Sequence, residues 1–153
     1  MKSILLALSC ILFTGAAFSQ NGFTHFVVKG GAVYRNAWVV SAGLDFASTH
    51  HSSYELAFTY YRNALEYQNY FLGVHYKPVL LRDKNTTVKF RLGAFAGTDT
   101  DRFIAAPNLG IEWLRSISGK VDFILSGGNG YYFFADTQTK WRITAEAGFR
   151  LSF

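Results

Sequence analysis

The chain has 153 residues, of which 18% are aromatic and only 16% charged, with 15 Lys and Arg against 10 Asp and Glu. A soluble domain averages about 25% charged residues and a disordered chain has few aromatic ones, so this composition excludes disorder and suits one charge-poor domain. The single cysteine excludes a disulfide framework and a zinc site built from cysteines. An isoelectric point near 9.4 raises the question of an anionic partner.

The first predicted element is a secretory signal peptide, residues 1–19. A lysine is followed by an apolar run from Ile4 to Phe13 and then by small residues, which is the pattern of such signals. Cleavage after residue 19 leaves residues 20–153 as one mature domain without sulfur. Lipidation at Cys10 is a weaker alternative, because it would cut the apolar core in half.

The rest of the chain alternates apolar and polar residues with the period of two that indicates β-strands. The alternation is unbroken from Trp141 to Phe153 and least regular from His25 to Arg35. Short connections separate about eight such segments, which is the number in the smallest membrane barrels. The strands are predicted around residues 25–35, 38–47, 54–61, 70–77, 88–97, 108–113, 121–126 and 141–153.

The apolar faces of these strands are predicted to contact lipid rather than to fill a lipocalin-like core. The polar face carries glycines, which suit a narrow barrel interior better than a solvated surface. The apolar face has no charge in mid-strand, and its aromatic residues lie toward strand ends as membrane girdles do. The glycines of the polar face are Gly43, Gly73, Gly93, Gly110 and Gly148. The aromatic residues of the apolar face are Trp38, Tyr60, Tyr70, Tyr76, Trp113, Tyr131 and Trp141.

The last strand resembles the C-terminal sorting signal of bacterial outer-membrane proteins through Phe149, Leu151 and Phe153. The fold class is therefore all-β, a single antiparallel transmembrane β-barrel of about eight strands that follows a signal peptide. The predicted location is the bacterial outer membrane. The expected partners are outer-membrane lipid and the barrel-assembly machinery.

Charged residues of both signs fall on the polar face, which is the barrel interior. Isolated charges in a narrow lumen cost several kcal/mol each unless they are paired. The near balance of signs thus predicts a salt-bridged plug and not an open pore. The predicted lumen network is Arg35, Asp45, Glu55, Lys77, Lys89, Arg91, Glu112, Asp122, Arg142, Glu146 and Arg150.

Two segments could carry chemistry, but both have a simpler interpretation. His50 to Ser53 with Glu55 supplies nucleophile, base and acid, yet adjacent residues in a turn rarely form a triad. Ser126 to Gly130 resembles a phosphate loop but lacks the Lys-Ser/Thr that should follow, so a bend or bulge at a barrel corner is expected there. We predict no enzyme activity, no cofactor and no metal site.

An excess of basic residues can also indicate a protein that binds nucleic acid directly. An OB-fold would need basic and aromatic residues on one surface. Here the two kinds lie on opposite strand faces, so nucleic acid is not predicted as a direct partner.

From residue 69 onward the order of features resembles the TraO family of conjugal-transfer proteins, which are small outer-membrane components. The resemblance rests on Tyr70 to Tyr76, Arg91 to Gly97, Gly110 to Glu112, Phe123 to Leu125 and Ala147 to Phe153. It implies a non-enzymatic accessory or structural role in a conjugal-transfer apparatus, with other transfer proteins as partners. The alternatives are a general envelope barrel for membrane integrity or partner binding, and an outer-membrane lipid hydrolase.

Overall fold

The computed structural model describes residues 24–34, 37–49, 51–63, 68–98, 102–133 and 140–152. The predicted signal peptide lies outside these residues. Within them, no helix is long and apolar enough to cross a membrane. The elements are β1 (Thr24–Val33), β2 (Ala37–Thr49), β3 (Ser52–Asn63), β4 (Gln68–Arg82), β5 (Thr86–Thr98), β6 (Phe103–Ser118), β7 (Val121–Tyr131) and β8 (Trp141–Ser152).

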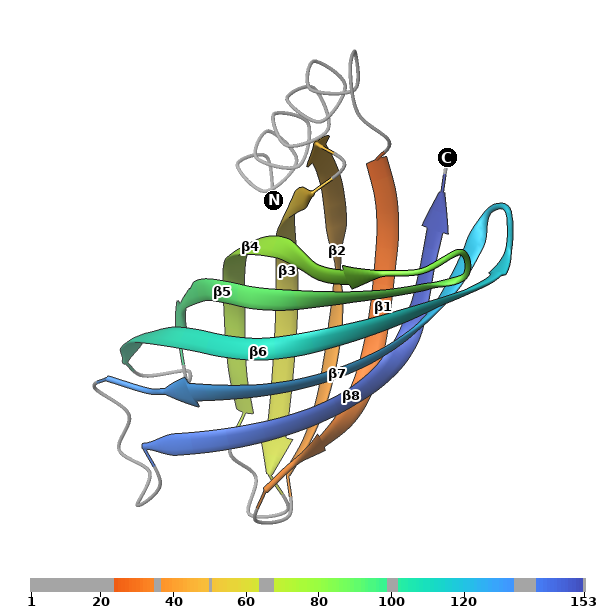
Figure 1. Ribbon diagram of the computed structural model, residues 1–153. Coiled ribbons are helices and arrows are strands. Elements are labelled where there is room, and N and C mark those ends of the chain that lie inside the picture. The colour runs from red at the N-terminus through yellow and green to blue at the C-terminus, as the bar shows by residue number, and fades with distance from the viewer. Residues whose placement is uncertain are drawn as a thin grey trace, which may run out of the picture.

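The eight strands form one closed antiparallel barrel in which each strand pairs with its neighbours in the sequence (Figure 1). Closure comes from the pairing of β1 with β8, where Val28 lies opposite Phe149. Closing the sheet leaves no unpaired edge, which a chain in lipid requires because no water is present to satisfy backbone groups. The predicted all-β fold, a single antiparallel barrel of eight strands, is confirmed, and the signal peptide before it stays a prediction.

The two ends of the barrel differ in the length of their connections. Residues 50–51, 83–85 and 119–120 join strands at one end, which we name the turn end, together with the start of β1 and the end of β8. The longer connections, up to residues 132–140, lie at the other end, which we name the loop end. Outer-membrane barrels carry short turns on the periplasmic side and longer loops outside the cell.

The irregularities of the sheet lie near the turn end and not at the glycines of β7. The register shifts at Ala47/Thr49, Val79/Leu81 and Ser116/Ser118. The glycines from Ser126 to Gly130 do not form a bulge, because β7 pairs with β8 without interruption from Val121 to Tyr131. Two predicted connections are also shorter than expected, since β4 begins at Gln68 and β6 at Phe103.

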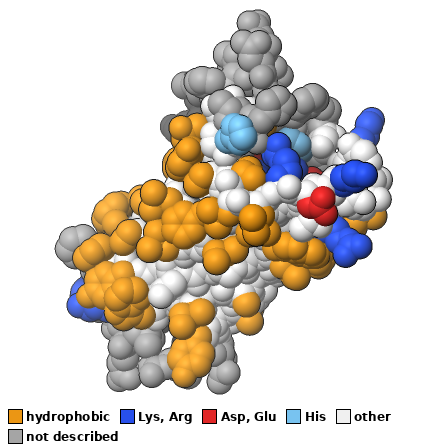
Figure 2. Space-filling model, in the orientation of Figure 1, with side chains coloured by type: hydrophobic (Ala, Val, Ile, Leu, Met, Phe, Trp, Pro, Cys, Tyr) orange, Lys and Arg blue, Asp and Glu red, His pale blue; other side chains and the backbone are white. Residues whose placement is uncertain are grey.

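The outer face of the barrel is apolar. Phe58, Val74 and Ile111 are each more than half exposed in mid-strand, and hydrophobic side chains are spread across the barrel face shown in Figure 2. Among the described strand residues that point outward, the only charged ones lie near the ends, at Arg62 and Arg115. This is the distribution of a membrane barrel and the opposite of a lipocalin-like one.

Aromatic side chains form a girdle near each end of this outer face. At the loop end Trp38 and Tyr60 have ring centroids 5.3 Å apart, and Tyr131 and Trp141 5.1 Å apart. At the turn end Tyr54 lies 5.2 Å from Tyr76, while Phe123 bridges Trp113 at 6.4 Å and Phe149 at 5.7 Å. Amphipathic rings at both rims match the two interfaces of a bilayer.

Candidate functional site, the barrel lumen

Among the described residues, ten charged side chains form a network in the lumen, five cationic and five anionic, and every strand contributes at least one. Alternation explains the placement, because every second side chain of a barrel strand points inward. Each member makes at least one ion pair of 4 Å or less with another member. The members are Lys29, Asp45, Glu55, Lys77, Lys89, Arg91, Glu112, Asp122, Glu146 and Arg150.

Lys77 on β4 stands at the centre of the network. Its Nζ lies 2.6 Å from Glu55 Oε2, 2.9 Å from Glu112 Oε1 and 3.1 Å from Asp45 Oδ2. Asp45 and Glu55 are directly opposite each other on β2 and β3, a pairing of like charges that is destabilising without a cation between them. Lys77 supplies that cation.

Lys29 on β1 approaches the same carboxylates from the other side. Its Nζ donates to Glu55 Oε1 at 2.9 Å and lies 3.8 Å from Glu112 Oε2. Glu55 therefore accepts one hydrogen bond from each lysine, one on each oxygen. All of these side chains are inaccessible to solvent, so the attraction is little screened.

The remaining members tie the centre of the network to the barrel wall. Lys89 donates to Ser53 Oγ at 2.8 Å and lies 3.4 Å from Asp45. Arg91 lies 3.9 Å from Glu55 and 3.7 Å from Glu146. Nearer the turn end, Arg150 holds Asp122 Oδ2 with both Nε at 2.8 Å and Nη2 at 2.6 Å.

Toward the loop end the lumen is closed by a second layer, the aromatic plug. Tyr132, which follows β7, turns inward and donates from its hydroxyl to that of Tyr61 at 3.2 Å. The Phe71 ring lies 5.4 Å from Tyr132 and 5.5 Å from Tyr61. The plug consists of Val33, Val39, Tyr61, Phe71, Phe95, Ile104, Ala106 and Tyr132, all buried.

His75 joins the aromatic plug to the charge network. Its ring contacts Phe95 edge to face at 5.0 Å, and it lies opposite Glu55 in the register of β3 and β4. Gly73 and Gly93 make room for these two rings, because a Cβ at Gly73 would overlap Phe95 and one at Gly93 would overlap His75. The inward glycines on these strands are thus required by the packing of the lumen.

The structure places nine of the eleven predicted lumen residues in the network and Arg142 outside it. Arg35 lies outside the described residues. Arg142 points inward but lies over the Tyr132 ring at 4.3 Å and the Tyr61 ring at 5.7 Å, so its observed contacts are with the aromatic plug. The prediction missed this because the sequence pattern did not show that Tyr61 and Tyr132 meet there.

Lys29 and the aromatic plug were not predicted from the sequence. The alternation of β1 is obscured because Val27 and Val33 are apolar and yet face inward. The signal that could have found Lys29 is its charge, since a lysine in the middle of a lipid-facing strand must point into the lumen.

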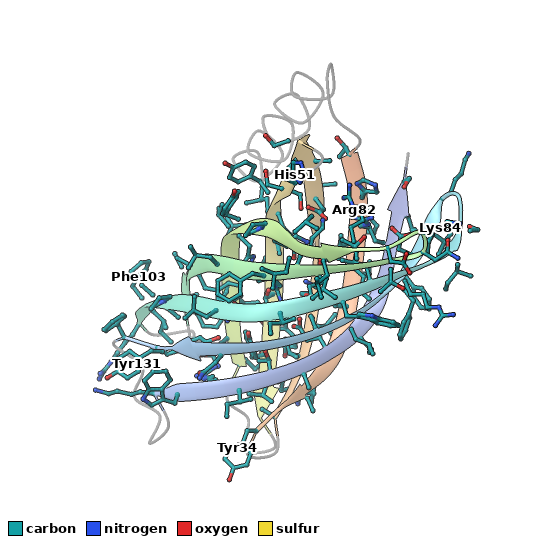
Figure 3. All side chains as sticks on the ribbon, viewed as in Figure 1. Tyr34, His51, Arg82, Lys84, Phe103 and Tyr131 are labelled. Atoms are coloured by element: carbon teal, nitrogen blue, oxygen red, sulfur yellow. The ribbon has the colours of Figure 1, made fainter. Side chains whose placement is uncertain are left out.

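Glu55 does not take part in a triad at the β2–β3 turn, and His50 lies outside the described residues. Glu55 points into the lumen, where Lys29 and Lys77 engage both of its oxygens, whereas His51 is exposed at the turn (Figure 3). The acid that would orient the histidine is therefore committed to the ion-pair network. Within the described residues, no group of three potential metal ligands is found either.

The proposed sorting residues lie on the outer face as far as the structure describes them. Phe149 is half exposed and Leu151 nearly as much, both toward lipid at the turn end. Phe153 lies outside the described residues. Recognition of these side chains by the assembly machinery stays a prediction.

Comparison with solved structures finds small β-barrels at low sequence identity. A de novo designed transmembrane β-barrel matches with a TM-score of 0.66 at 13% identity, covering 88% of this chain and 98% of that one. A major outer-membrane protein of Thermus thermophilus gives 0.62 at 12%, covering 88% and 100%. Neisserial surface protein A gives 0.60 at 12%, covering 86% and 97%.

These matches establish the fold, which is that of small outer-membrane barrels. The apolar exterior with two girdles agrees with that architecture. Comparison with protein-family models finds no match, and neither does a sequence comparison with curated proteins. The resemblance to TraO therefore gains no support.

Proposed function

We propose that the protein is a closed, non-enzymatic structural barrel of the bacterial outer membrane. The observation that carries this proposal is the filled lumen inside a lipid-facing exterior. Lys77, Glu55 and Glu112 are fully buried in mid-lumen, and Phe71 and Tyr132 are fully buried above them. A barrel of eight strands has room only for side chains, so its useful surfaces are its lipid face and its two ends.

The test combines location with conductance. The tagged protein is expected in the outer-membrane fraction, with the heat-dependent gel migration of a closed barrel. Reconstituted into planar bilayers, it should give no conductance steps. Recovery as a soluble periplasmic protein would refute the barrel proposal, and steady single-channel conductance would refute the closed lumen.

The role in the envelope can be tested separately by deletion. A structural barrel predicts greater sensitivity to detergent and to large antibiotics, restored by the wild-type gene. A deletion strain with an unchanged envelope barrier would refute this role while leaving the fold intact.

The conjugal-transfer role is the narrower prediction, and it has only the resemblance behind it. If it is right, deletion in a donor strain that carries a conjugative element should lower mating frequency. Unchanged mating frequency would remove it.

A further inference from the structure

A pocket opens at the turn end, between the β4–β5 hairpin and the lower lumen. It has a volume of about 240 Å³, below the roughly 300–1,000 Å³ of sites for drug-sized ligands. Its size suits a compact polar group. Its lining includes Arg82, Lys84, Asn85, Thr87, Ser116 and Arg150, a set of cations, hydroxyls and an amide.

The hairpin that carries Arg82 and Lys84 is fixed by backbone hydrogen bonds. Asp83 N donates to Thr86 O at 2.8 Å and closes the turn, and Ser116 N donates to Asn85 O at 2.8 Å and holds the turn against β6. The pocket wall is therefore built by two hairpins together. Figure 3 shows Arg82 and Lys84 at this end of the barrel.

The charge of the pocket favours an anion. Two carboxylates, Asp83 and Asp122, also line it, but Asp122 is paired with Arg150 at 2.6 Å. Within the described part of the chain, no carboxylate forms an ion pair with Arg82 or Lys84. An anion entering the pocket would find these two cations free to bind it.

The surroundings of the pocket add positive charge and apolar surface. Arg115 follows the girdle residue Trp113 on the outer face of β6, and Lys120 lies in the β6–β7 turn; both are exposed. Leu81, beside Arg82, is 69% exposed. In Figure 2, most of the visible Lys and Arg side chains gather at the end of the barrel that carries the β4–β5 and β6–β7 turns, next to hydrophobic side chains.

We propose that this pocket binds the phosphate of an anionic phospholipid in the periplasmic leaflet. The inference rests on the proposed function, because the short turns face the periplasm only if the chain is an outer-membrane barrel. Arg82 and Lys84 bind the phosphate, and Arg115 and Lys120 draw anionic lipid to the rim. The acyl chains lie along the apolar face. Basic residues at a membrane surface select anionic lipid in this way.

The experiment measures lipid selectivity next to the pocket in the folded protein. The variant Trp38→Phe/Trp141→Phe leaves Trp113 as the only tryptophan. Its fluorescence is compared in phosphatidylcholine vesicles that contain either brominated phosphatidylglycerol or brominated phosphatidylcholine. Each basic residue near a membrane surface changes lipid binding about five-fold, so we expect a preference of about five-fold or more for phosphatidylglycerol.

Two matched comparisons locate the site. Lys84→Gln should lower the preference more than Lys120→Gln, because the charge change is equal but only Lys84 lines the pocket. Arg62→Gln/Lys140→Gln removes two exposed cations at the loop end and should leave the preference unchanged. Equal losses from Lys84→Gln and Lys120→Gln would overturn the pocket as the site.

Further outcomes separate the lipid from other sources of phosphate and from a failed barrel. Inorganic phosphate at constant ionic strength should not reduce the preference, and competition by it would reassign the pocket to the free ion. Equal quenching by both lipids in inserted, heat-modifiable protein would overturn this proposal alone. A chain that does not insert would instead contradict the proposed function.

Discussion

At the scale of single residues, Lys77 determines whether the lumen is stable. Three carboxylates from three different strands converge on its ammonium group within 3.1 Å. Burying charge is costly, and breaking a buried pair by removing one partner is worse, because the remaining charges stay uncompensated. The same contacts join β2, β3 and β4 to β6 on another part of the barrel wall.

Lys77→Met is therefore expected to lower the free energy of unfolding by about 3–5 kcal/mol, measured by urea unfolding in micelles. Lys120→Met, at an exposed turn, should change it by no more than about 0.5 kcal/mol. Adding Glu112→Gln to Lys77→Met should restore part of the loss, because one uncompensated carboxylate is removed. Strictly additive effects would show that the pair does not interact.

Gly73 shows the same tight packing on the aromatic side of the lumen. Gly73→Ala forces a Cβ into the Phe95 ring and should cost about 1–3 kcal/mol of unfolding free energy. Gly127→Ala is the matched control, since nothing approaches its added Cβ more closely than 3.8 Å. Similar unfolding midpoints for the two variants would contradict the packing described here.

At the scale of elements, the alternation within a strand predicts which side chains face lipid and which face the lumen. It does not predict which residues of other strands they contact. The unbroken alternation of β8 was sufficient to predict which of its side chains face lipid. The inward aromatic residues Tyr61, Phe71 and Phe95 follow the same period, yet nothing in one strand shows that they meet Tyr132 across the lumen. Which residues meet depends on strand register and barrel closure, and these are set by contacts between segments distant in the sequence.

The period also predicts how each strand tolerates charge. Val74 lies in the middle of the outer face and Leu81 lies near the turn end, and the two side chains are 56% and 69% exposed. If only exposure mattered, lysine at either position would change the free energy of unfolding by the same small amount. In a bilayer, Val74→Lys should cost about 2–4 kcal/mol of unfolding free energy, and Leu81→Lys about 0–1. The measurement is urea unfolding from phosphatidylcholine vesicles. Equal costs would mean that the apolar face is not in lipid.

At the scale of the whole molecule, two layers of different chemistry close the lumen in series. Ion pairs stabilise the charge network, whereas ring contacts and one hydrogen bond between two tyrosine hydroxyls stabilise the aromatic plug. The two layers contact each other through His75 and Phe95, but each layer blocks the lumen with its own side chains. Each layer alone should therefore be sufficient to block ions.

This predicts a conductance that appears only when both layers are opened. Phe71→Ala/Tyr132→Ala opens the plug, and Lys77→Ala/Glu112→Ala removes one cation and one carboxylate from the network, so the charge balance is kept. In planar bilayers each double variant should stay closed, and the quadruple variant should give small conductance steps. Heat-dependent gel migration of every variant shows which ones retain the barrel. Conductance from the plug variant alone would mean that the ion-pair network does not close the lumen.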